Sequence, residues 1–247
     1  SHRNWKTEAP SIILPPDFVF LVILPASSGS RVRHHRHPPG VRPAHVAAVF
    51  DESLTTSFRN ELYPDYKANR EPAPPELKRQ FEMCRGLAAA LGLAGYSSDR
   101  YEADDLIGTL AAALRPQGFA IEILSADKDL AQLVGERAVL WDYARKRRHG
   151  YADIPELLGV RPEQVADWLA LTGDAVDNIP GVPGIGAKTA AALLAEFGSV
   201  DGLYADLDAV ADSGIRGAVR FSRLLAEHAA TVRLAQRLTC IEFDPDL

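Results

Sequence analysis

Tyr101-Glu102-Ala103-Asp104-Asp105 carries three carboxylates within four residues, and a helical apolar stripe follows it at Leu106, Ile107, Leu110 and Leu114. Positions three and four apart share one face of a helix, so Glu102 and Asp105 are expected on one side with Asp104 beside them. Acids are also favoured in a first helical turn, because the helix dipole is positive there. These acids therefore fit either an ordinary helix start or a metal site, and the flanking sequence has to distinguish the two.

Short apolar runs on both sides of this stretch alternate with helical sequence. Strands are expected at Val46–Phe50, Ile121–Leu124 and Ala138–Trp141, with helices over Glu76–Leu91 and Leu106–Leu114. Strands that alternate with helices predict an α/β fold, in which a parallel sheet is covered on both faces. Ligands of such sheets bind beyond the carboxyl ends of the strands.

Acids follow the first two expected strands. Asp51 ends the first, and Asp127 and Asp129 come just after the second, while the helix that starts near Glu102 should point its N-terminus at the same edge. Each acid alone also fits a turn or a helix cap, as we interpret Asp142. Six acids close together, however, need cations to neutralise them. Oxygen ligands favour Mg²⁺ or Mn²⁺ over zinc, and two such ions about 4 Å apart suit in-line attack on a phosphodiester.

A basic and aromatic segment, residues 57–70, follows Asp51. Lys67 and Arg70 are three residues apart and would share a face if the segment is helical, with Tyr63 and Tyr66 interleaved. Cations mixed with aromatic rings suit a phosphate backbone and unstacked bases, although a solvated helix is the plainer alternative. Prolines at 72, 74 and 75 then predict an exposed loop or arch.

From about residue 160 the pattern is helical and poor in strands. Asp174 and Asp177 are spaced one helical turn apart and could face one ion. Gly184-Ile185-Gly186 predicts a tight turn before a helix over Ala187–Phe197. The free N–H groups at the start of this helix would suit a phosphate. Alternatively, the two glycines form only the C-cap turn of a preceding helix. Lys188 adds a charge, and Arg216, Arg220 and Arg223 supply further cations. A P-loop is excluded, because one residue separates the last glycine from Lys188 and no strand precedes the turn.

The composition is that of an ordinary globular protein of one large or two small domains, with 247 residues, 47% of them hydrophobic and 24% charged. The net charge of −6 does not point to nucleic acid, but a cluster of metal-binding acids would itself lower the total. Cys84 and Cys240 fit neither a disulfide framework nor a zinc site, so a cytoplasmic location is expected. Phe18–Leu24 is far too short to span a bilayer, and no membrane association is expected.

From about Pro43 to the C-terminus the chain resembles the 5′-3′ exonuclease family, which includes the 5′-nuclease domain of bacterial DNA polymerase I, its free-standing relatives and the flap endonucleases. Five ordered motifs carry this resemblance, namely His45–Asp51, Phe58-Arg-Asn through Tyr66–Arg70, Tyr101–Asp105, Ser125–Asp129 and Leu171–Thr189. The resemblance implies a parallel-sheet PIN-like nuclease core with a helical arch over residues 43–160. A helical module over residues 161–247, a helix-three-turn-helix, would grip duplex DNA.

The resemblance also implies roles for individual residues. One metal ion would lie near Asp51, Glu102 and Asp104, and a second near Asp127, Asp129, Asp174 and Asp177, with Asp105 in support. Lys67 would polarise the scissile phosphate and Arg70 would steady the 5′ strand. The turn at Gly184, Ile185 and Gly186, with Lys188 and Thr189, would hold duplex phosphates, often with a potassium ion on backbone carbonyls. The implied activity is hydrolysis of DNA at 5′ ends, flaps or branches by a monomer with two Mg²⁺ or Mn²⁺ ions.

The N-terminus departs from this family. Residues 1–42 match it nowhere and are expected to be poorly ordered. The family begins with a strand that ends in a metal-ligand Asp, whereas Phe18–Leu24 ends in Pro25-Ala26-Ser27 and Asp17 precedes the run, at the wrong end. A shifted reading frame, an alternative start or a damaged gene would account for the mismatch. Two further functions stay open: a branched-DNA-binding protein with little or no catalysis, and a different enzyme such as a small ribonuclease or a phosphatase.

Overall fold

Six strands form one mixed sheet in the order β3-β2-β1-β4-β5-β6. Their bounds are β1 Phe18–Leu24, β2 His45–Asp51, β3 Ala94–Ser98, β4 Ala120–Leu124, β5 Ala138–Asp142 and β6 Arg147–His149. The computed structural model describes residues 18–24, 43, 45–52 and 55–243. The pairs β2–β3 and β4–β5 are parallel, whereas β1 runs antiparallel to both of its neighbours and β6 runs antiparallel to β5.

The central strand β1 lies within the segment that was expected to be poorly ordered. Because β1 is antiparallel to β2, its first residue Phe18 pairs with Phe50, directly before Asp51, and Ile23 pairs with His45. The expected parallel pairing is present at β2–β3 and β4–β5, and β1 and β6 add antiparallel strands to the same sheet. The N-terminal end of β1 therefore lies at the same edge of the sheet as Asp51, which is not where a strand parallel to β2 would start, and Asp17 itself lies outside the described residues.

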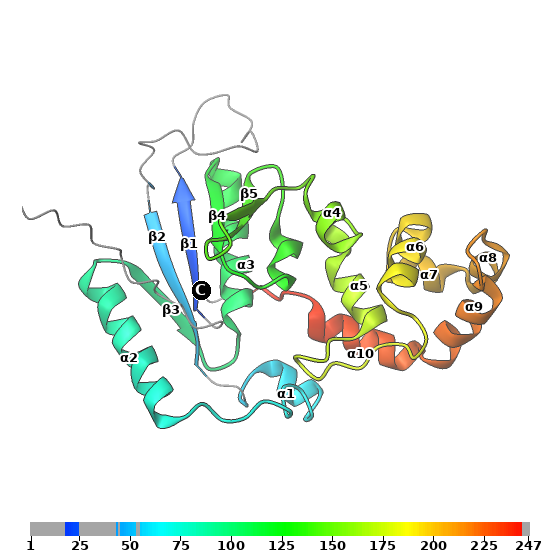
Figure 1. Cartoon of the computed structure of the whole chain (residues 1–247), viewed down its shortest axis with the longest axis horizontal. Helices are drawn as coiled ribbons and strands as arrows, with labels where there is room; N and C mark the ends of the chain where they lie inside the picture. The colour runs from blue at the N-terminus through cyan, green and yellow to red at the C-terminus, as the bar shows by residue number, and fades with distance from the viewer. Residues whose placement is uncertain (1–17, 25–42, 44, 53–54, 244–247) are drawn as a thin grey trace, which may run out of the picture.

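Helices cover both faces of this sheet. Strand side chains alternate between faces, so Ala47 and Val49 of β2 pack into the main core with α3 (Ala103–Leu114), while Ala48 and Phe50 face Ala88 of α2 (Pro75–Ala90). Both helices match the sequence prediction closely. A short helix, α1 (Phe58–Leu62), lies near the end of β2 (Figure 1).

The C-terminal part is helical, as predicted. Its helices are α4 Ile154–Leu158, α5 Val165–Thr172, α6 Ala187–Phe197, α7 Val200–Ala205, α8 Leu207–Asp212, α9 Ala218–Glu227 and α10 Ala229–Thr239, with a short 3₁₀ turn at Pro162–Gln164. Two other 3₁₀ turns, Arg115–Gln117 and Asp129–Leu133, lie among the strands of the sheet. Figure 1 shows α6 to α9 gathered at one end of the molecule, with α10 running back towards the sheet. Within the described residues, no helix has both the length and the apolar character needed to cross a membrane.

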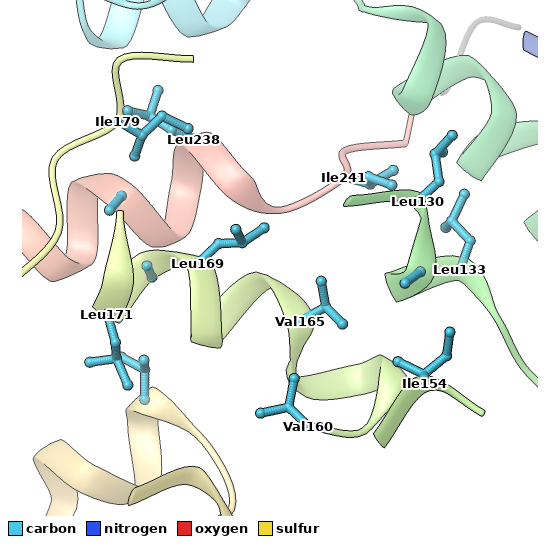
Figure 2. Close-up of a cluster of buried hydrophobic side chains, with 14 of the residues drawn as sticks. Leu130, Leu133, Ile154, Val160, Val165, Leu169, Leu171, Ile179, Leu238 and Ile241 are labelled. Carbon is cyan, nitrogen blue, oxygen red and sulfur yellow. The ribbon is translucent and has the colours of Figure 1, made fainter. Parts of the chain in front are cut away.

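The two parts share one hydrophobic core. Figure 2 shows Leu130 and Leu133 from the sheet side close to Ile154, Val165 and Ile241, with Leu169 and Leu238 continuing the cluster along α5 and α10. All of these side chains belong to the same buried cluster as Ile121 and Ile123 of β4. The helical part is therefore packed against the sheet, and the orientation of α10 relative to α3 is fixed by burial.

Candidate metal centre

A narrow cleft of about 60 Å³ lies at the carboxyl edge of β2 and β4. We name it the acid cleft, and its acidic lining is Asp51, Glu102, Asp104, Asp127, Asp129 and Asp177. Asp51 ends β2, Asp127 and Asp129 follow β4, and Asp104 lies in the first turn of α3. The structure thus brings together six of the eight acids that the sequence proposed as metal ligands. Asp105 and Asp174 are the two that lie outside the lining.

The start of α3 is tied to the end of β2. Oδ1 of Asp51 accepts a 2.7 Å hydrogen bond from the backbone N–H of Ala103, and Oδ2 of Asp105 accepts one of 3.0 Å from the N–H of Glu102. Free N–H groups at a helix N-terminus attract carboxylates. These bonds fix the positions of Glu102 and Asp104 relative to the sheet.

Asp105 serves the fold and does not face the acid cleft. It is fully buried, and its two oxygens accept hydrogen bonds from Nη1 and Nη2 of Arg59 at 2.6 and 2.8 Å. The backbone N–H of Glu242 donates a further bond to Oδ1 at 2.9 Å. Arg59 is itself buried, and it also donates to the carbonyl oxygens of Leu238 and Cys240 at 2.8 and 2.9 Å. With its oxygens used in this way, Asp105 does not line the acid cleft in this structure, and its supporting role towards a metal stays a prediction.

Three side chains of the basic segment lie among the acids. Nζ of Lys67 is 2.7 Å from Oε1 of Glu102 and 3.8 Å from Oδ2 of Asp177, and Nη2 of Arg70 is 2.5 Å from Oδ1 of Asp177. The hydroxyl of Tyr66 donates towards Glu102 at 2.9 Å and Asp177 at 3.2 Å. After α1, residues 64–69 of this segment form turns, with Lys67 at a φ of +55°, so Lys67 and Arg70 do not share a helical face.

Asp174 and Asp177 belong to a closed loop rather than to a helical turn. Asp174 and Ile179 exchange backbone hydrogen bonds of 3.0 and 2.8 Å across the loop. Oδ1 of Asp174 accepts from the N–H of Val176 at 2.7 Å, and Oδ2 lies 3.2 Å from Nζ of Lys128. The two acids therefore have different partners in this structure, and they lie in a loop rather than on a helix as their spacing suggested, while their binding of one ion stays a prediction.

Burial and mutual repulsion raise the pKa values of the central acids. Burial, followed by the charge of Asp127, raises the pKa of Asp129 to about 7. Burial also raises the pKa of Asp104, with Asp127, Asp51 and Glu102 adding repulsion, and it raises that of Asp127, with repulsion from Asp177. Oδ1 of Asp129 is buried without a hydrogen-bond donor. The cleft therefore has unsatisfied negative charge.

The cations on the rim only partly compensate for this charge. Burial alone would lower the pKa of Lys67, but the carboxylates of Glu102, Asp177 and Asp51 raise it above its usual value. Within the described residues, no three acidic, imidazole or thiol side chains stand in a ready metal-binding arrangement. Because Lys67 and Arg70 lie against Glu102 and Asp177, an incoming ion would have to displace them before these two acids could ligate it.

A much larger groove adjoins the acid cleft. It has a volume of about 860 Å³ and shares Asp51, Tyr66, Lys67 and Arg70 with the cleft. Its other side is formed by Phe81 and Arg85 of α2, and Arg85 forms an ion pair of 2.5 Å with Glu52. The groove therefore meets the acid cleft at Asp51 and at the side chains of Tyr66, Lys67 and Arg70.

The predicted anion site lies in the helical part, away from the cleft. Gly184 has a φ of +92°, which favours glycine, and Ile185 is buried beneath the turn. Gly186 is the N-cap of α6 and has no side chain to accept the first helical N–H groups, while Lys188 is exposed and Thr189 half-buried. The turn and helix predicted from the sequence are thus present.

Two site residues were not assigned a role from the sequence. Tyr66 was read only as an aromatic neighbour of cations, yet its hydroxyl bridges Glu102 and Asp177. Arg59 lies in the motif Phe58-Arg-Asn, but it donates to the backbone carbonyls of Leu238 and Cys240. These residues are 179 and 181 positions further along the sequence. A local pattern contains no signal for such contacts.

Comparisons with known proteins agree with this architecture. Residues 34–159 match the family described as 5′-3′ exonuclease, N-terminal resolvase-like domain, and residues 160–247 match 5′-3′ exonuclease, C-terminal SAM fold. The first match begins inside the N-terminal segment that had seemed unmatched. Among solved structures, the T5 5′-exonuclease with bound divalent metal ions (zinc) has a TM-score of 0.64 at 24% identity, covering 77% of this chain and 71% of that one. This likeness shows the fold.

Curated relatives are more similar in sequence. The flap endonuclease Xni of Serratia proteamaculans is 40% identical over 202 residues, which cover 80% of each chain. DNA polymerase I of Bacillus caldotenax is 41% identical over 202 residues, which are 77% of this chain but only 22% of the polymerase. The chain thus spans about a fifth of the polymerases that it matches and most of the free-standing Xni protein.

Proposed function

The chain belongs to the 5′-3′ exonuclease family, and from this we propose that it is a divalent-metal-dependent nuclease that hydrolyses DNA phosphodiesters at 5′ ends or flaps. The relatives named flap endonuclease Xni support the nuclease activity, and 80% of such a protein is covered by the match. The proposed substrate is a branched or flapped DNA duplex, and the proposed protein is a monomer.

This proposal is carried by the buried and unsatisfied carboxylate of Asp129. Its carboxylate has a pKa of about 7, raised by burial and then by Asp127, and its Oδ1 atom is buried without a donor. A carboxylate in this state gains most from a cation, because the cation removes both the repulsion and the unsatisfied acceptor. An all-oxygen donor set selects a hard cation such as Mg²⁺ or Mn²⁺.

We assign the acids to two ions. The first ion would be held by Asp51, Glu102 and Asp104. The second ion would be held by Asp127, Asp129 and Asp177. Asp174 would reach the second ion after its release from Lys128. Two such ions, when bound, would polarise the phosphate and lower the pKa of the attacking water. Asp105 is left out of the ligand set, since Arg59 and backbone N–H groups occupy its oxygens.

Lys67 and Arg70 would change partners when substrate binds. Both now neutralise acids, with Lys67 against Glu102 and Arg70 against Asp177. The raised pKa of Lys67 keeps its ammonium group protonated. Once cations replace them on the acids, these side chains are available to a scissile phosphate and to the neighbouring phosphate of the 5′ strand. Tyr66 would keep Glu102 and Asp177 oriented through its hydroxyl.

The large groove beside the cleft is the proposed path of the 5′ strand. Its wall offers Phe81 for base stacking and Lys78 for phosphate contact, and it opens directly onto Lys67 and Arg70. The duplex would be held by the turn at Gly184, Ile185 and Gly186 with Lys188 and Thr189, through free amides and charge. A potassium ion on the backbone carbonyls of this turn is part of the same proposal.

The test is Asp127→Ala assayed on a 5′-flap duplex with Mg²⁺ and, for sensitivity, with Mn²⁺. We expect cleavage to be abolished while binding to the same DNA remains measurable. Asp142→Asn is the matched control, because Asp142 ends the neighbouring strand β5 but bonds to Arg145 of its own turn. Undiminished cleavage by Asp127→Ala would contradict the proposal. Metal-dependent cleavage that Asp127→Ala removes excludes the alternative of a DNA-binding protein without catalysis, whereas preference for single-stranded RNA would favour a ribonuclease.

A further inference from the structure

A set of hydrogen bonds beside the acid cleft joins two segments that supply its side chains. One segment is the turn at residues 64–70, which carries Lys67 and Arg70, and we name it the basic turn. The other is the loop at residues 174–179, which carries Asp177, and we name it the acid loop. The backbone N–H of Lys67 donates to the carbonyl oxygen of Asp177 at 2.9 Å, so the two segments are in direct contact.

Two side-chain amides extend this contact on either side. Nδ2 of Asn69 donates to the carbonyl oxygen of Ala175 at 2.8 Å, and Nδ2 of Asn178 donates to that of Asp65 at 2.7 Å. Along the basic turn, the partners on the acid loop come in reverse order, so the two segments run in opposite directions. We name the three hydrogen bonds between them the clasp.

The clasp holds two backbone positions in the left-handed region. The φ angle is +55° at Lys67 and +57° at Asn178. Asparagine enters this region readily, because its short polar side chain can bond locally, whereas lysine rarely does. A residue in such a sparsely populated conformation persists only when its surroundings hold it there. For Lys67 these surroundings include the clasp, since its own N–H makes the central bond.

Each segment also has hydrogen bonds that close it on itself. In the basic turn, the N–H of Arg70 donates to the carbonyl oxygen of Lys67 at 3.0 Å. In the acid loop, Asp174 and Ile179 exchange backbone hydrogen bonds. The clasp therefore fixes mainly the position of one segment relative to the other. Both of its side-chain amide bonds are exposed, so the loss of either amide should change the stability of the protein little.

The clasp differs from the ion pairs of the basic turn because it contains no ionised group. Lys67 pairs with Glu102 at 2.7 Å, and Arg70 pairs with Asp177 at 2.5 Å. In the proposed function, metal ions replace both cations on these acids, so the ion pairs open when the ions bind. Hydrogen bonds to backbone carbonyl oxygens do not compete with a metal ion for a carboxylate. The clasp therefore remains to hold the basic turn in place after the ion pairs have opened.

We infer that Asn69 and Asn178 are positioning residues that act through Lys67. They keep its backbone on the acid loop, so that its ammonium group stays at the acid cleft when metal ions and DNA are bound. This inference rests on the proposed function, which assigns Lys67 to the scissile phosphate. Neither amide contacts the phosphate or the metal ions in this arrangement.

The first test measures amide hydrogen exchange by NMR in the metal-free protein. Asn69→Ala removes one amide of the clasp, and Asn178→Gly removes the other, while glycine accepts the φ of +57°. Exchange of the Lys67 N–H should become about five- to tenfold faster in each variant, as expected for the loss of one hydrogen bond. The N–H of Ile179 is the internal control, because it donates to Asp174 within the acid loop. Unchanged exchange at Lys67 in both variants would overturn the inference.

The second test measures cleavage of a 5′-flap duplex and, separately, Mn²⁺ binding by calorimetry. In Asn69→Ala and Asn178→Gly, kcat should fall about tenfold, because misplacing a group that touches the reacting phosphate is costly. KM and the affinity for Mn²⁺ should hardly change. Gln117→Ala is the matched control, because the amide of Gln117 also makes an exposed bond to a backbone carbonyl, at 3.0 Å to Ala113. A loss of Mn²⁺ affinity in parallel with kcat would show that the clasp supports the acids instead, and it would overturn the role of Lys67.

A third measurement asks whether Asn69 acts through Lys67. In a Lys67→Met background, Asn69→Ala should lower kcat little further, because the group that it positions is already gone. A tenfold loss in both backgrounds would mean that Asn69 acts by another route.

The outcomes separate this inference from the proposed function. A parent protein that cleaves no flap DNA with Mg²⁺ or Mn²⁺ contradicts the proposed function, while exchange at Lys67 still tests the clasp. A parent that cleaves, together with clasp variants that cleave at the same rate, overturns the positioning role alone.

Discussion

Arg59 and Asp105 form a two-pronged ion pair, with Nη1 to Oδ2 at 2.6 Å and Nη2 to Oδ1 at 2.8 Å, and both side chains are almost completely buried. The same guanidinium binds the carbonyls of Leu238 and Cys240 at the end of α10. One side chain thus joins α1, the start of α3 and the end of α10. Because Glu102 precedes this start of α3, the ion pair also determines where a candidate metal ligand lies.

We predict that Arg59→Ala strongly destabilises the protein. It leaves the Asp105 carboxylate buried without its partner, and breaking a buried pair in this way typically costs about 3–5 kcal/mol. Urea unfolding, followed by circular dichroism, measures the difference. Arg100→Ala is the control, because Arg100 and Glu61 form an exposed pair, for which a loss of about 0–1 kcal/mol is expected. Equal losses in the two variants would contradict the structural role of Arg59.

The stability of the metal-free protein should fall as the pH rises from about 4 to about 7. The pKa of Asp129 is raised from 3.8 to about 7 in the folded state, so the folded protein holds this proton more tightly than the unfolded chain does. The bound proton on Asp129 stabilises the folded protein fully at a pH below the pKa of Asp129 in the unfolded chain. This stabilisation is lost as the pH rises through the pKa of Asp129 in the folded protein. Melting temperatures in EDTA should show this decline, and Asp129→Asn should flatten it between pH 5 and about 7. An unchanged slope in this variant would exclude Asp129 as the source.

Divalent cations should raise the melting temperature more at pH 8 than at pH 5.5. At the higher pH Asp129 is ionised and repelled by Asp127, so binding of Mg²⁺ or Mn²⁺ relieves repulsion without first displacing a proton. Differential scanning calorimetry at matched ionic strength measures the shift, with KCl replacing the divalent salt as the control. A shift of the same size at both pH values would mean that these carboxylates do not bind the ion.

Lys67→Met should separate metal binding from turnover. Nζ of Lys67 now lies 2.7 Å from Glu102, so its removal makes the acid cleft more negative and should tighten Mn²⁺ binding in calorimetric titrations. Cleavage should nevertheless fall about 10²–10³-fold, the usual loss for one donor to a reacting oxyanion. Lys146→Met is the control, because Lys146 is an exposed lysine in the turn between β5 and β6, and it should change neither value much. Weaker Mn²⁺ binding in Lys67→Met would contradict this account.

Much of the fold follows from local sequence patterns. The strands β2, β4 and β5 and the helices α2, α3 and α6 were predicted nearly to their bounds, because each has a distinct apolar run or stripe. β3 was missed, since Ala94–Ser98 is a largely exposed edge strand whose only large apolar residue is Tyr96. The direction of β1 was also missed. Phe18–Leu24 forms the same run in either direction, and only its pairing with β2 and β4 fixes the choice.

The candidate site was predictable where the topology alone places a residue. Asp51, Asp127 and Asp129 follow strands that end at one edge, so the sheet itself brings them together. The surroundings of Asp105 could not be predicted, because a spacing of three residues on a helix does not show which neighbour a carboxylate meets. Its partner Arg59 is 46 positions away in the sequence. The local structure at Asp174 was also missed, since a loop closed on Ile179 replaces the helix that its spacing suggested.

The reversed direction of β1 has a practical consequence for handling this protein. Ile23 pairs with His45 and Leu24 pairs with Ala120, so β1 ends and β2 begins at the edge of the sheet opposite the acid cleft. A peptide tag or fluorophore introduced into the link between β1 and β2 would start from that far edge. Surface immobilisation through such a tag would leave the acidic edge facing the solution, which makes the link a natural anchor for single-molecule observation.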